Sequence, residues 1–195
     1  MHTFGLGVVL NDPAFVHPSA QAYGHVTLEE GSSLWPNSVI RAETQHVRIG
    51  RFSNIQDFVM IHIAFATPTV VGDYCSITHH CTLHGCTIGD NCLIGINTTV
   101  MDGCVIGDNC IVAGHTFLKE NTVIPDNSIV MGTPGAVVKT RNNFVANRVN
   151  ALAYYENARA YAAGNHRAWD GEEAARAFAR MTAEAQAAFA ATREG

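Results

Sequence analysis

The sequence predicts an all-β fold, a left-handed parallel β-helix of hexapeptide repeats with triangular coils, followed by a C-terminal α-helical extension. Two observations lead to this prediction. An aliphatic residue recurs at every sixth position over long stretches of the first 140 residues, and the pattern then changes to an Ala-rich one of helical spacing. We therefore expect a β-helix domain over residues 1–140 and a helical extension over residues 141–195.

The repeat is clearest in the second half of the predicted β-helix, where eight positions in a row at a spacing of six are aliphatic. The fourth residue after each of the first seven is small. A hexad of this kind forms one flat side of a triangular coil, so that the aliphatic side chain fills the interior and three hexads complete a turn. The aliphatic positions are Ile88, Ile94, Val100, Ile106, Val112, Leu118, Ile124 and Val130.

Six cysteines suggest a metal cluster or disulfides at first sight, but no CxxC pair is present, which argues against a zinc ribbon. Only Cys86 falls outside the repeat, and we expect it to pack in the interior as well. In the small slot a thiol acts as a small apolar group. The five cysteines in that slot are Cys75, Cys81, Cys92, Cys104 and Cys110.

The C-terminal segment has apolar residues such as Val145 and Val149 at helical spacing, and Gly164 is a typical helix stop. Asp170 is a candidate N-cap for a second helix from Glu172 to Arg193. We expect both helices to lean on the β-helix or on a neighbouring chain. In the simplest case they close an open end of the coil stack, where strand edges would otherwise be exposed.

Composition excludes several functions. The net charge is −5, only 15% of the residues are charged, and no basic run occurs, so that nucleic acid and anionic membrane surfaces are not expected partners. No apolar stretch is long enough to span a bilayer. The first residues lack the basic segment and cleavage site of a secretory signal, and we expect a cytoplasmic protein.

The most informative of the ten histidines are His62, His79, His80 and His84. His79 follows His62 by seventeen residues, close to one coil, so the spacing places these two on the same side of adjacent coils. His84 would point outward around the next corner. Three outward imidazoles suit a tetrahedral Zn²⁺ with one open position, and a trimer would bring a corner of one chain to its neighbour. Alternatively, they are surface or interface hydrogen-bonding groups.

Three segments carry a resemblance to a known family: NSVIRAE (37–43), VRIGRFSNIQDFVMIHI (47–63) and SITHHCTLHGCTIGDNCLIGINTTVMDG (76–103). Together they resemble the γ-class carbonic anhydrase-like family over about residues 10–140. The specific motifs are NIQD and HxxxxHGC. By contrast, the closing VMGTPGAVVK (130–139) is also typical of many hexapeptide acyltransferases and does not discriminate.

The resemblance implies a homotrimer that hydrates CO₂ reversibly to bicarbonate at zinc sites between subunits. His62 and His84 of one subunit and His79 of its neighbour match the zinc ligands, and Fe²⁺ or Co²⁺ would also suit such a site. Gln56 matches the glutamine that bonds the zinc-bound hydroxide, and Asp57 matches the aspartate that supports the site.

The resemblance also assigns Arg41 to an Arg-x-Asp motif that forms an ion pair across the subunit boundary, although Glu43 stands here in place of the aspartate. No residue matches the glutamate that carries protons in this family. His80, Glu43 or buffer would then have to carry the proton away. His80 has a suitable ordinary pKa of about 6.5.

Three other functions remain open from the sequence. A zinc-dependent acyl-CoA thioesterase or hydrolase would use the same metal on a thioester. A hexapeptide acyltransferase would use a histidine as general base on acyl-CoA, and His115 is the candidate. A non-catalytic trimeric scaffold would keep the zinc without the reaction.

Overall fold

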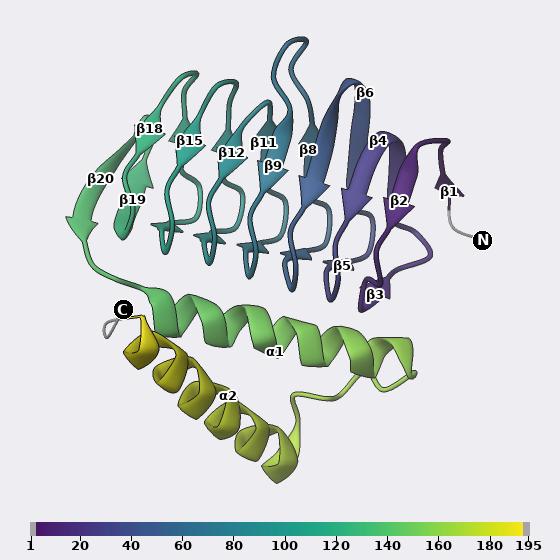
Figure 1. Ribbon diagram of the computed structural model, residues 1–195, viewed down its shortest axis with the longest axis vertical. Coiled ribbons are helices and arrows are strands. Elements are labelled where there is room, and N and C mark those ends of the chain that lie inside the picture. Colours follow the sequence, from purple (N-terminus) through teal and green to yellow (C-terminus); the bar gives the residue numbers. More distant parts are fainter. Residues whose placement is uncertain (1–2, 193–195) are drawn as a thin grey trace.

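The computed structural model describes residues 3–192, which form a stack of about seven coils followed by two helices (Figure 1). The strands belong to an eight-stranded and a twelve-stranded sheet, and they pair in parallel from coil to coil except at the last hairpin. This arrangement confirms the predicted fold class.

The first face of the prism is the eight-stranded sheet. Its strands are β3 (Phe15–Val16), β5 (Ser33–Leu34), β7 (Asn54–Ile55), β10 (Ser76–Ile77), β13 (Leu93–Ile94), β16 (Ile111–Val112), β19 (Ser128–Gly132) and β20 (Gly135–Thr140). The antiparallel β20 folds back on β19 and ends this face.

The second and third faces form one sheet because β4 (Gln21–Leu28) and β6 (Val39–Ile49) bend around their shared corner. The second face adds β1 (Thr3–Phe4), β8 (Met60–His62), β11 (Thr82–His84), β14 (Thr99–Val100) and β17 (Phe117–Leu118). The third adds β2 (Val8–Leu10), β9 (Thr69–Val71), β12 (Thr87–Ile88), β15 (Val105–Ile106) and β18 (Val123–Ile124).

The interior is the aliphatic column that the repeat predicts. The eight positions from Ile88 to Val130 are at most 4% exposed, and all six cysteines, Cys86 included, are unpaired and buried among them. Burial raises the pKa of the Cys81 thiol to about 11, so this thiol is protonated at neutral pH and acts as an apolar group.

Three corners run along the coil stack, and we name each by its most distinctive residues. The aspartate corner joins the third face to the first and holds Asp73, Asp90, Asp108 and Asp126. The His79 corner joins the first face to the second and holds Asp57 and His79. The His84 corner joins the second face to the third and holds Glu43, His62, His84 and Asp102.

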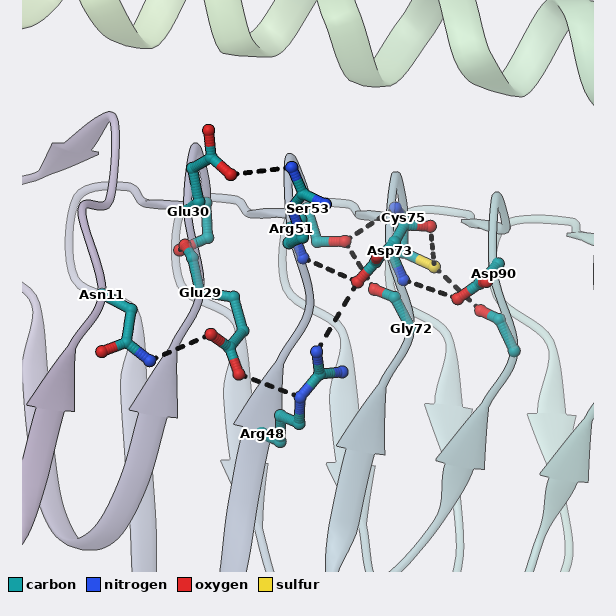
Figure 2. A network of polar contacts seen from close by, with 12 residues as sticks. Asn11, Glu29, Glu30, Arg48, Arg51, Ser53, Gly72, Asp73, Cys75 and Asp90 are labelled. Atoms are coloured by element: carbon teal, nitrogen blue, oxygen red, sulfur yellow. Dashed lines mark hydrogen bonds and ion pairs between the residues drawn. The ribbon is translucent and has the colours of Figure 1, made fainter. Parts of the chain in front are cut away.

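The aspartate corner is held by one contact repeated from coil to coil (Figure 2). Asp108 Oδ1 accepts a 2.7 Å hydrogen bond from the backbone N–H of Asp90, and Asp90 Oδ1 accepts one of 2.8 Å from the N–H of Asp73. Glycine precedes Asp73, Asp90 and Asp108 because the next coil comes so close there. A Cβ on Gly89 would lie 2.3 Å from Asp108 Oδ1.

The helices α1 (Phe144–Ala162) and α2 (Gly171–Ala191) follow β20. The expectation that the helical extension leans on the β-helix is confirmed for α1, which lies along the first face, and α2 packs on α1 (Figure 1). The simplest case, in which the helices close an open end of the stack, is wrong. Asn147 holds α1 in place by donating to the carbonyls of Asn91 (2.9 Å) and Cys110 (3.0 Å). The buried asparagine side chain of the helix thus pairs with backbone carbonyls of the coil stack that would otherwise lack a donor on this side.

The second helix begins where the sequence indicates, with Asp170 at its N-cap position, but the aspartate side chain makes no capping hydrogen bond. The predicted end at Arg193 lies outside the described residues. Among residues 3–192, neither helix combines the length and the apolar character that crossing a membrane requires.

Candidate metal centre

Two of the three predicted histidine ligands meet at the His84 corner. His62 ends β8, His84 ends β11, and the two are register partners, with Arg41 of β6 next in the same row. His62 Nδ1 lies 3.1 Å from His84 Nε2. The expectation from spacing that His62 and His79 share a side is wrong, because the loop after β8 lengthens this coil and brings His84 into register with His62 instead.

Each imidazole at this corner also contacts a carboxylate on its outer nitrogen. Glu43 Oε2 lies 2.9 Å from His62 Nε2, and Asp102 Oδ1 makes a short contact with His84 Nδ1. A neutral imidazole that donates its one N–H to a carboxylate has an acceptor on its other nitrogen. Both acceptors then face each other across the 3.1 Å gap between His62 and His84.

Two facing lone pairs repel unless a proton or a metal ion lies between them. In a tetrahedral Zn²⁺ site with Zn–N bonds of about 2.0–2.1 Å, neighbouring nitrogens are about 3.3 Å apart. The observed 3.1 Å between His62 Nδ1 and His84 Nε2 is close to this value. The donor set at the His84 corner therefore fits two ligands of such a site, with carboxylates fixing the ring tautomers as they do around many metal-bound histidines.

The third predicted ligand lies at the other end of β11, at the His79 corner. His79 Nδ1 is 3.1 Å from Asp57 Oδ2, so its Nε2 is left as the open nitrogen, as at the other histidines. The side chain is 37% exposed. Within residues 3–192 of a single chain, no three His, Cys, Asp or Glu side chains converge in a way that could hold a metal ion.

Comparison with known proteins supports the family assignment. A Methanocaldococcus jannaschii protein named probable carbonic anhydrase is 50% identical over 133 residues, which cover 67% of this chain and 84% of that protein. The chain belongs to the γ-class carbonic anhydrase-like family. Gamma carbonic anhydrase 1 of Arabidopsis thaliana mitochondria is 37% identical over 108 residues, 52% of this chain, and the match spans 39% of that longer protein.

Other comparisons connect this γ-class family member to the wider hexapeptide group. The family model described as bacterial transferase hexapeptide (six repeats) matches residues 85–120. The carnitine operon protein CaiE of Escherichia coli is 38% identical over 136 residues, 70% of this chain and 69% of that protein. The solved structure of a hexapeptide transferase family protein from Anaplasma phagocytophilum has a TM-score of 0.72 at 25% identity, covering 83% of this chain and 96% of that one.

Two more predicted site residues of this γ-class chain adjoin the His79 corner. Gln56 is 1% exposed and donates through Nε2 to Asn54 Oδ1 at 2.9 Å. Its Oε1 is buried and has no hydrogen-bond partner among the described residues. Asp57 follows it in the chain and contacts His79. The predicted contact of Gln56 with a zinc-bound hydroxide stays a prediction.

Arg41 pairs with Glu43 within the same chain, at a contact where both side chains are nearly half exposed. Partial desolvation works to raise the pKa of Glu43, but hydrogen bonding with His62 and the charge of Arg41 outweigh it, and the pKa lies below its ordinary value. Glu43 is therefore ionised at neutral pH. Arg41's predicted ion pair across a subunit boundary stays a prediction.

A hollow of about 320 Å³ opens beside the two histidines of the His84 corner. The loop after β8, which stands above the neighbouring turns in Figure 1, supplies its apolar wall. Phe65 at the tip of that loop is 87% exposed. The hollow is lined by Arg41, Glu43, Thr44, His62, Ile63, Phe65 and His84.

Sequence reasoning did not identify Asp102 as a site residue. It occurs in a Met-Asp-Gly turn that looks like any other coil corner, and its role depends on stacking against His84 in the preceding coil. One signal could have found it, because it follows His84 by eighteen residues, the length of a regular coil.

Proposed function

We propose that this protein is a zinc-dependent carbonic anhydrase that hydrates CO₂ reversibly to bicarbonate. The observation that carries the proposal is the pair of open nitrogens on His62 and His84, 3.1 Å apart, each imidazole held by a carboxylate on its other side. Three neutral imidazoles around one Zn²⁺ lower the pKa of a bound water to about 7, which supplies hydroxide at neutral pH.

The same proposal requires a homotrimer. One chain offers two open imidazole nitrogens at the His84 corner and one at the His79 corner, at the two ends of β11. In a three-fold ring with the second faces turned inward, the His79 corner of each chain approaches the His84 corner of the next. Each seam then has His62 and His84 from one subunit and His79 from its neighbour, a heterologous contact that closes.

The chain's own residues would then orient the reactants. Asp102 and Glu43 hold the ring nitrogens of His84 and His62, and Asp57 does the same for His79. Gln56 has a buried acceptor, Oε1, without a partner among the described residues, and this atom suits a hydroxyl proton. Such preorganised groups stabilise charge without rearrangement during the reaction.

The hollow at the His84 corner suits a small apolar substrate. Ile63 and Phe65 provide apolar surface, while Arg41, which also lines the hollow, can attract the bicarbonate product. Glu43 is ionised, about half exposed and in contact with His62, so it is our candidate for passing the proton to bulk water. His80 is exposed but stacked on Phe58 at a centroid distance of 4.9 Å, on the His79 corner.

Acyl-group chemistry is the second candidate, favoured by the structural similarity to a hexapeptide transferase family protein. In that case His115 would be the base. It is exposed, and among the described residues its ring makes no hydrogen bond that would orient it. A general base normally needs such an orienting partner. His62 and His84 each have a carboxylate partner that orients the ring.

The test combines metal analysis with rate measurements on the purified protein. We expect close to one zinc per chain, CO₂ hydration that is lost with a chelator and regained with Zn²⁺, and no hydrolysis or transfer of short acyl-CoA thioesters. Acyl-CoA turnover that survives complete metal removal would contradict the proposal and favour the second candidate. A metal-free protein that does not take up Zn²⁺ would contradict it as well.

A further inference from the structure

A second cavity lies between the His79 corner and α1, away from the hollow at the His84 corner. Its volume is about 180 Å³. That is about six times the ~30 Å³ share of a water molecule in the liquid and below the ~300 Å³ of typical drug-sized sites. The cavity can hold a small polar molecule or group but not a drug-sized ligand. It is lined by Trp35, Pro36, Asp57, Tyr154, Asn157, Tyr161 and Trp169.

Aromatic rings form most of this wall. Trp35, which directly follows β5, packs against Tyr154 and Tyr161 of α1 at centroid distances of 5.5 and 4.9 Å. Trp169, from the segment that joins the helices, stands edge-to-face to Tyr154 at 5.1 Å. These mutual contacts hold the rings in fixed positions, so the cavity is already formed without a ligand.

The polar groups of the cavity are negative or neutral. Asp57 is the one ionisable carboxylate among the lining residues, and no Lys or Arg lines it. Among the described residues, its only ion-pair contact is with His79 through Oδ2, and Oδ1 makes no hydrogen bond. Burial, and to a smaller extent the charge of Asp57, raises the pKa of Tyr154 to about 12, so that its hydroxyl stays protonated at neutral pH.

A largely buried polar side chain of the cavity has no hydrogen-bond partner among the described residues. Asn157 of α1 is 7% exposed and lines the cavity, and its side-chain amide, which is accessible from the cavity, makes no hydrogen bond to any described residue. Buried amides are normally paired, and one that opens into a cavity without a partner indicates that a ligand or an ordered water completes it.

We propose that this cavity is a binding site for a small alkylammonium cation with a hydroxyl or carbonyl group. Aromatic rings attract such cations through their negative faces. Asp57 supplies the opposite charge and Asn157 the hydrogen bond. The site goes beyond the proposed zinc chemistry, and it exists because α1 lies against the first face instead of closing an end of the stack.

The test uses choline as the probe on the full-length protein, with 3,3-dimethylbutan-1-ol as the neutral isostere and NaCl at matched ionic strength as controls. The chain has two tryptophans, and both line the cavity, so their fluorescence reports on this site. We expect a saturable emission change with choline and none with either control. An equal response to the neutral isostere, or none to choline, would overturn the proposal.

Variants sharpen the test by calorimetry. Trp169→Leu removes an exposed ring and should weaken choline binding about tenfold, whereas Trp169→Phe keeps a ring and should retain most of the affinity. Asp57→Asn should also weaken binding, and unchanged affinity in both Trp169→Leu and Asp57→Asn would overturn the proposal. Zinc content should be unaffected by Trp169→Leu, so that failure here is distinguishable from failure of the zinc proposal.

Discussion

The aspartate corner and the His84 corner use the same device for different ends. In both, a carboxylate oxygen of one coil accepts a hydrogen bond from a residue eighteen positions earlier: Asp108 from Asp90, and Asp102 from His84. At the aspartate corner the donor is a backbone N–H, which has no other role. At the His84 corner the donor is an imidazole, and its second nitrogen is left open.

This difference explains how a repetitive fold can carry a site without changing its architecture. The carboxylates of the aspartate corner satisfy backbone groups that would otherwise be unpaired, so that their contribution is to stability. The carboxylates of the His84 corner fix the ring tautomers, so that they contribute to the affinity for the metal ion that would bind the open nitrogens.

Replacing one aspartate by alanine at each corner should separate the role in metal binding from the role in stability. Asp102→Ala should lower zinc affinity about 10- to 100-fold, because His84 loses the partner that fixes its ring. Asp108→Ala should leave zinc affinity unchanged and cost about 1 kcal/mol of unfolding free energy, the worth of one hydrogen bond. Competitive zinc titration and urea unfolding measure the two quantities. Equal effects of both variants on zinc affinity would remove the contrast.

Crowding the aspartate corner should destabilise the coil without touching the metal site. Gly89→Ala places a Cβ 2.3 Å from Asp108 Oδ1, and such overpacking costs about 1–3 kcal/mol. In the Gly89→Ala/Asp108→Ala double variant the loss should be smaller than the sum, because the clashing oxygen is gone. Strict additivity in urea unfolding would mean that the two residues do not contact.

The smallest effect is expected at Glu43, which both orients His62 and reaches solvent. Glu43→Gln should slow CO₂ hydration about threefold to tenfold at low buffer concentration, and added imidazole buffer should restore most of the rate, because a soluble base replaces the carboxylate. A rate that is equally low at every buffer concentration would assign Glu43 to orientation alone.

The sequence predicts the coil and its interior well because a repeat of six is a local signal. All eight aliphatic repeat positions, from Ile88 in steps of six to Val130, are buried, as the pattern predicts. The site is predicted less completely because its contacts join different coils. The longer coil created by the loop after β8 moved His84, and not His79, opposite His62. Nothing in the sequence around Asp102 identifies it as a site residue. Only its separation of eighteen residues from His84 indicates that the two side chains meet.

The placement of the C-terminal helices also depends on contacts that no local pattern reveals. Helical spacing predicts that α1 exists, but its position on the first face depends on Asn147 meeting the carbonyls of Asn91 and Cys110. The aromatic cavity depends on the same docking, since Trp35 and Tyr154 come from segments far apart in the chain.

Complementation between inactive chains tests the proposed site between subunits most directly. His79→Ala and the double variant His62→Ala/His84→Ala should each be free of zinc and inactive as a pure protein. When the two are co-expressed, one seam of each mixed trimer regains all three imidazoles, so that random mixing restores about a quarter of the wild-type zinc and activity. Mixed trimers, isolated by two affinity tags, that hold no zinc would contradict a site shared between chains.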